Sequence, residues 1–142
     1  MTVMENLGII TFLMMRNPAF KELSLSQISG IVEPPLAKRL AVTATLPNKD
    51  GANTVPLAFA LFAKVNDDWD AKLRDPGFPI TNLPAEAWDS GGNKWMVAFL
   101  STQKTSGAFV EKAARAIWPK GGTLHIRAAA ADGSPEIGKR KF

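Results

Sequence analysis

The chain has 142 residues, of which 46% are hydrophobic and 21% are charged, so we expect one globular domain spanning residues 1–142 with a sizeable core. It contains no cysteine, which excludes disulfides, thiolate metal sites and a cysteine nucleophile, and we expect no metal site of any kind. The net charge of +4 favours anionic partners, but the sequence has no nucleic-acid-reading motif, so nucleic acid is not an expected partner.

The first helix is expected over residues 5–16, where apolar side chains occur on nearly every side. Such a helix is typical of a buried core or of a subunit contact. The apolar run at 7–15 is too short to span a bilayer, and Glu5 precedes it where a signal peptide would carry basic residues. We therefore expect no membrane span and no signal peptide, and a cytoplasmic location.

A second helix is expected to begin at Ser24 or Ser26, either of which can cap it, and to run through Val32. Pro34 and Pro35 should end this helix, because proline lacks the amide donor and its ring clashes with the preceding turn. The prediction is a short helix followed by a connector.

Residues 36–46 and 54–65 alternate apolar and polar side chains on either side of a turn sequence at 48–51. This pattern predicts an antiparallel hairpin. A short helix is expected next, over residues 67–74, with acidic side chains at its positive end.

The last third of the chain predicts a strand, a helix and a second hairpin. Residues 94–101 form a nearly continuous apolar run, as in a central strand. Residues 106–118 have the spacing of an amphipathic helix, and 124–130 and 136–142 read as a terminal hairpin. The expected order is α-α-β-β-α-β-α-β-β, which is an α+β fold.

One segment carries a distinctive motif. It contains Trp88, a Ser-Gly turn at 90–91, the basic residue Lys94 and then Trp95, followed by the apolar strand and the amphipathic helix. This pattern resembles the RTX toxin-activating (hemolysin-activating) protein-lysine acyltransferases. The resemblance covers most of the chain and is strongest over residues 58–118.

The resemblance implies a GNAT-like acyltransferase fold, with a mixed, mostly antiparallel sheet flanked by helices. It implies transfer of a fatty acyl group from acyl carrier protein to lysine side chains of an RTX protein, without a bound cofactor. The family's catalytic histidine and aspartate correspond to Phe20 and Ala98, and neither side chain can accept a proton. We therefore expect a divergent member that is catalytically impaired and retained for binding; the alternative is an active acyltransferase with a non-standard base.

Two side chains are candidates for a non-standard base, although a structural role explains each of them as well. His125 is the only histidine and lies on a predicted strand, and Asp89 lies in the turn before the central strand. Three further carboxylates open the third helix, where capping and compensation of the helix dipole explain them. These are Asp67, Asp68 and Asp70.

The segment between the central strand and the next helix lies where GNAT-type proteins hold the acyl donor. Free amides at a helix start, and a glycine that permits close approach, make an anion site here physically reasonable, although any serine-capped helix looks similar. The candidate donor-binding residues are Lys104, Thr105, Ser106, Gly107 and Ala108.

The four tryptophans are expected to pack in the core or in groove walls, because an indole buries a large area. They are Trp69, Trp88, Trp95 and Trp118. The resemblance also implies a bacterial protein whose partners are an acyl carrier protein and an RTX-type protein. The apolar first helix, together with the pairing of family members, predicts a homodimer or another protein contact.

Overall fold

The computed structural model describes residues 3–17, 20–47, 54–102, 106–129 and 135–142, so the turn predicted at 48–51 and the residues that connect the two strands of the terminal hairpin lie outside it. Its helices and strands are α1 (Val3–Met14), α2 (Leu25–Ala37), β1 (Ala41–Pro47), β2 (Thr54–Val65), α3 (Asp67–Leu73), β3 (Asn93–Ser101), α4 (Ser106–Ile117), β4 (Thr123–Ala129) and β5 (Pro135–Lys141). The predicted order is confirmed, with two short 3₁₀ turns, Ile80–Asn82 and Ala85–Ala87, added between α3 and β3.

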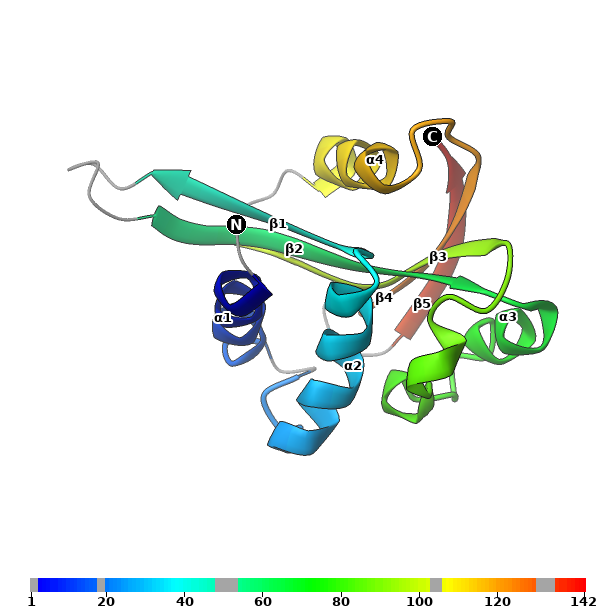
Figure 1. The fold of residues 1–142 in the computed structure, drawn as a ribbon, viewed down its shortest axis with the longest axis horizontal. Coiled ribbons are helices and arrows are strands. Elements are labelled where there is room, and N and C mark those ends of the chain that lie inside the picture. The colour runs from blue at the N-terminus through cyan, green and yellow to red at the C-terminus, as the bar shows by residue number, and fades with distance from the viewer. Residues whose placement is uncertain (1–2, 18–19, 48–53, 103–105, 130–134) are drawn as a thin grey trace.

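The strands form one sheet in the order β1-β2-β3-β4-β5. Neighbouring strands are antiparallel except for β3 and β4, which run parallel. Helix α4 covers one face of the sheet, and α1 and α2 cover the other (Figure 1). This α+β arrangement is consistent with the expected GNAT-like fold. No helix in the described ranges is long and apolar enough to cross a membrane.

Each face of the sheet has its own hydrophobic cluster. The cluster on the α1 and α2 side contains Trp88 and Trp95, both fully buried, with Trp69 packed at its edge. The cluster beneath α4 contains Phe62, whose ring meets the partly buried Trp118 edge-on at 5.7 Å between centroids. The packing role predicted for the four tryptophans is confirmed.

Helix α2 continues through Pro34 and Pro35, so the prediction that they end it is wrong. An interior proline costs about 3 kcal/mol, whereas burial of one large apolar side chain contributes about 1.5–3 kcal/mol. The buried face of α2 offsets that cost and consists of Ile31, Val32, Pro35 and Leu36. Because the helix runs on, the first strand begins at Ala41 and not at residue 36.

Ser24, and not Ser26, is the N-cap of α2. The Gln27 amide donates to the Ser24 hydroxyl at 3.1 Å, and the Ser24 amide donates to the Gln27 side-chain oxygen at 2.9 Å, which is a capping box. We predict that Ser24→Ala lowers the free energy of unfolding by about 1 kcal/mol and that Ser26→Ala has a much smaller effect. Urea denaturation followed by circular dichroism measures both; equal losses would contradict the assignment of the cap.

Candidate functional site

The two positions at which the resemblance places the catalytic pair are apolar and dry. Phe20 is 9% exposed and Ala98 is 3% exposed, and both belong to the hydrophobic cluster on the α1 and α2 side of the sheet. Because a catalytic pair must act on one proton, the resemblance predicts that these two positions lie near each other at a cleft. The structure brings both side chains into one hydrophobic cluster. Neither of them lines the groove that lies between the end of α1 and the end of β3.

That groove, with a volume of about 210 Å³, lies between the end of α1 and the end of β3. It is lined by Leu13, Arg16, Asn17, Leu100, Ser101 and Thr102. Arg16 gives the groove a permanent positive charge, and its Nη1 also donates to the Phe12 carbonyl at 3.3 Å. The groove therefore combines apolar walls with a site of attraction for an anionic group.

The chain passes from this groove towards the candidate donor-binding segment. Lys104 and Thr105 lie outside the described residues, so the structure does not place them. Helix α4 begins at Ser106 and continues through Gly107, and Ala108 is exposed in its first turn. The expected passage from a central strand into a helix start is thus present, within the limits of the described residues.

The only parallel strand pair of the described sheet is short. Strands β3 and β4 are in register at two positions, Trp95 opposite His125 and Met96 opposite Ile126. Beyond these positions the two strands part, and Figure 1 shows β4 and β5 running steeply across the direction of β1, β2 and β3. A strand edge that is freed from its neighbour offers backbone donors and acceptors to an extended chain.

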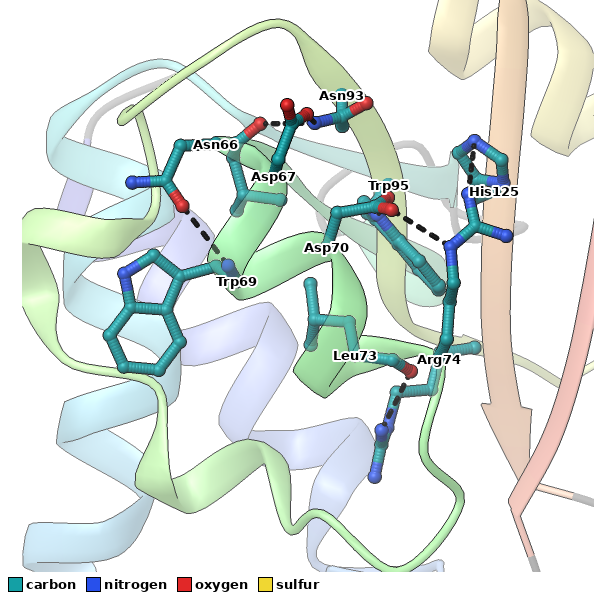
Figure 2. Close-up of polar contacts among 11 residues, drawn as sticks. Asn66, Asp67, Trp69, Asp70, Leu73, Arg74, Asn93, Trp95 and His125 are labelled. Carbon is teal, nitrogen blue, oxygen red and sulfur yellow. Dashed lines mark hydrogen bonds and ion pairs between the residues drawn. The ribbon is translucent and has the colours of Figure 1, made fainter.

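A polar cluster lies beside this parallel pair (Figure 2). The Trp95 indole nitrogen donates to Asp70 Oδ1 at 2.8 Å, and Arg74 Nε donates to Asp70 Oδ2 at 2.8 Å. Arg74 Nη2 lies 3.4 Å from His125 Nε2, and the Trp95 and His125 ring centroids are 5.1 Å apart. The cluster joins three segments that are far apart in sequence: the end of α3 with Asp70 and Arg74, β3 with Trp95, and β4 with His125.

Asp70 therefore does not cap α3, although it lies in the first turn, where a carboxylate compensates the helix dipole as expected. Asn66 caps α3, because its side-chain oxygen accepts from the Trp69 amide at 3.0 Å. Asp67 instead accepts a hydrogen bond from the Asn93 side chain at 3.0 Å. The Asp70–Arg74 spacing of four residues was the signal in the sequence for their ion pair, but nothing in the sequence pointed to Trp95 or His125 as neighbours.

The contacts within the cluster shift the pKa values of Asp70 and His125. Burial raises the pKa of Asp70, but the hydrogen bonds from Arg74 and Trp95 and the positive charge of Arg74 together hold it below its ordinary value. Burial and the positive charge of Arg74 lower the pKa of His125, and Lys139 adds to this while Asp70 opposes it. At neutral pH the carboxylate is ionised and the imidazole is neutral. Since a guanidinium only donates, Nε2 is the accepting nitrogen of His125.

A buried cation fixes α3 beside this cluster. Arg127, on β4, is 7% exposed, and its Nη1 donates to the backbone carbonyls of Leu73 and Asp75, each at 3.0 Å. Burial lowers the pKa of Arg127 and Asp75 raises it, and the guanidinium remains charged. Arg127 is a residue that the sequence analysis missed, because an arginine on an alternating strand gives no sign that it is buried.

Asp89, the other candidate base, lies apart from the polar cluster. It is exposed, and its backbone forms an isolated parallel β-bridge with Lys64 on β2. It is not among the residues that line the groove beside α1. The structure thus brings His125 into a polar network and leaves Asp89 at the surface.

Trp95→Phe and Trp88→Phe are a matched pair of variants, since both indoles are fully buried in the same cluster. The Trp95 nitrogen donates to Asp70, whereas the Trp88 nitrogen has no acceptor among the described residues. We expect Trp95→Phe to cost about 1.5–3 kcal/mol more, because that is what a hydrogen bond to a charged group contributes. Urea denaturation measures the difference; equal costs would show that the bond to Asp70 contributes nothing.

Comparison with known proteins agrees with the fold and with the motif around Trp88 and Trp95. A sequence model of the RTX toxin acyltransferase family matches residues 1–137. No curated protein matches the chain. Because the family match covers nearly the whole chain, this protein belongs to the RTX toxin acyltransferase family.

Proposed function

We propose that this protein is a toxin-activating acyltransferase-like protein that binds the partners of the reaction and transfers acyl groups poorly. The observation that supports this is the chemistry at positions 20 and 98. Lysine acylation needs a base to take a proton from the ammonium before the amine attacks the thioester carbonyl and the carrier thiol leaves. Phe20 and Ala98 are buried and apolar, so neither can supply or orient such a base.

The proposed partners are an acyl carrier protein that carries a fatty acyl thioester and an RTX-type protein with target lysines, in the bacterial cytoplasm. The groove beside α1 supports carrier binding, because Arg16 would attract the phosphate of a phosphopantetheine arm and the apolar walls would contact its acyl end. The parted edge of β3 supports it as well, since a pantetheine arm contains amides. We propose that Lys104, Thr105, Ser106, Gly107 and Ala108 complete this donor site in a single domain.

The second candidate function is an active acyltransferase that uses a non-standard base. The observation in its favour is that His125 is neutral at neutral pH and has a defined orientation. Its ring contacts the Arg74 guanidinium, and Arg74 in turn donates to Asp70. Against it, the accepting nitrogen of His125 already faces the Arg74 guanidinium. The imidazole could take a proton only after Arg74 moved away, so impaired transfer is the better proposal. Asp89 is a weaker candidate, because it is exposed and unconnected to the cluster.

The activity test compares the unaltered chain with the variant Phe20→His plus Ala98→Asp. Each protein is incubated with acyl carrier protein charged with a long-chain acyl group and with a lysine-bearing RTX fragment, and mass spectrometry measures acylation of the fragment. Loss of a catalytic base typically costs about 10²–10⁴-fold in rate, so we expect the unaltered chain to be at least about a hundredfold slower than the variant. Both proteins should bind the charged carrier.

Efficient acylation by the unaltered chain would contradict impaired transfer, and His125→Gln and Asp89→Asn would then be assayed for loss of activity. Failure of the unaltered chain to bind the charged carrier would contradict the proposed binding role. Arg16→Gln is the matched variant for that measurement, since it removes the charge of the groove but keeps a polar side chain of similar length. We expect it to weaken binding of the carrier.

We also propose a homodimer, because the outer surface of α1 is apolar. One side of the helix is buried through Ile10, Leu13 and Met14, which is less than the all-round burial suggested by its sequence. Large apolar side chains remain exposed on α1, just after it and at the start of α2, and they are Val3, Met4, Phe12, Met15 and Leu25. A patch of this kind is typical of a protein contact.

The dimer is tested by light scattering at high protein concentration. We expect the mass of two chains for the unaltered protein and of one chain for Met4→Lys combined with Met15→Lys, because charged groups at a buried contact are strongly unfavourable. Leu46→Lys, on the edge strand β1, is the control variant. It should leave the dimer intact if the chains pair through α1, and it should give single chains if they pair through the sheet edge. A strictly monomeric unaltered protein would rule the homodimer out.

A further inference from the structure

A second cavity, with a volume of about 400 Å³, lies at the carboxyl end of α4. Its principal lining residues are Lys64, Lys94, Ile117, Trp118, Pro119 and Lys120. Lys94 is at the start of β3, whereas the groove beside α1 is lined by the end of that strand. The cavity is therefore separate from the groove proposed for the acyl donor.

Two of the lysines form a like-charged pair across the sheet. Lys64 on β2 and Lys94 on β3 are directly opposite each other in the antiparallel register, and both are partly buried. Like charges directly opposite on neighbouring strands are destabilising. Lys120, an exposed residue in the loop after α4, lines the same cavity and adds a third lysine to it. A bound anion would offset the repulsion between Lys64 and Lys94.

Lys94 is held so that its charge faces the cavity. Its Nζ donates to the Gly121 carbonyl at 3.2 Å and lies 5.9 Å from the Trp118 ring centroid. Trp118 is fixed in turn by its edge-on contact with Phe62. The cavity thus has a positioned ammonium group beside a positioned aromatic wall.

No carboxylate of the described residues forms an ion pair with these lysines. The cavity lining contains no acidic side chain, and none of the described ion pairs involves Lys64, Lys94 or Lys120. Asp89 is the partner of Lys64 in an isolated backbone β-bridge, but its side chain is exposed and does not line the cavity. The positive charge therefore remains available to a ligand.

We propose that this cavity binds a small organic anion, a carboxylate or phosphate group carried on an apolar body. The ammonium groups of Lys64, Lys94 and Lys120 bind the anionic oxygens, and Ile117, Trp118 and Pro119 contact the apolar part. The volume of about 400 Å³ is within the usual range for small-molecule sites and far exceeds what an inorganic ion needs. The site is independent of acyl transfer, so it stands whether or not the chain is active.

Isothermal titration calorimetry at low salt tests the proposal with octanoate and with phenyl phosphate, which represent the two sources of the anion. At least one of them should bind, and the tighter one identifies the source. Octanol and inorganic phosphate each provide half of the ligand and should bind about tenfold more weakly or worse. Binding should also weaken as salt rises, because the attraction is electrostatic.

Lys64→Met should weaken binding of the better ligand by about tenfold or more, whereas Lys112→Met, on the exposed side of α4, should leave it unchanged. In the absence of ligand, Lys64→Met should raise the melting temperature at low salt, because it removes the repulsion from Lys94. Lys120→Met, in an exposed loop, gives the same binding test without altering the sheet. The proposal is overturned if neither ligand binds, if octanol binds as well as octanoate, or if both lysine variants bind as the unaltered chain does.

Discussion

Burial of β3 on both faces is the constraint on which the remaining structure depends. Trp95 faces the cluster beneath α1 and α2, while Met96 faces the cluster beneath α4. A strand in this position needs helices on both sides to cover it and strands on both edges to satisfy its backbone. The Trp95 indole also carries a donor into the interior, and Asp70 on α3 accepts from it. The third helix is therefore held to the sheet by a polar contact as well as by burial.

The same burial explains why the positions of the expected catalytic pair are dry. A histidine at position 20 and an aspartate at position 98 would have to be hydrated or paired, since an isolated ionised group in an apolar interior is very unfavourable. With Phe20 and Ala98 in place, that region joins the hydrophobic cluster instead. The polar groups of the domain gather elsewhere, around Asp70 and Arg74, where α3 meets the parallel strand pair.

Strand β3 and helix α4 place two sites of different character at opposite ends of one strand–helix unit. At the end of β3, the groove has one cation, Arg16, and open backbone nearby, which suits an extended donor. At the start of β3, three lysines and an aromatic wall surround a larger cavity. Both sites are proposed to bind anions, which accords with the net charge of +4, and only the first is proposed to take part in the reaction of the family.

The sequence by itself determined the order of elements, the α+β class, the packing of the tryptophans and the family, because hydrophobic periodicity and local turn chemistry are recorded residue by residue. It did not determine the end of α2, where tertiary burial of Pro35 and Leu36 overrides the local effect of two prolines. Nor could it reveal that Asp70 reaches Trp95, that Arg127 is buried, or that Lys64 is opposite Lys94. These contacts join residues 25–54 positions apart or depend on strand register, and only the folded chain brings their atoms together.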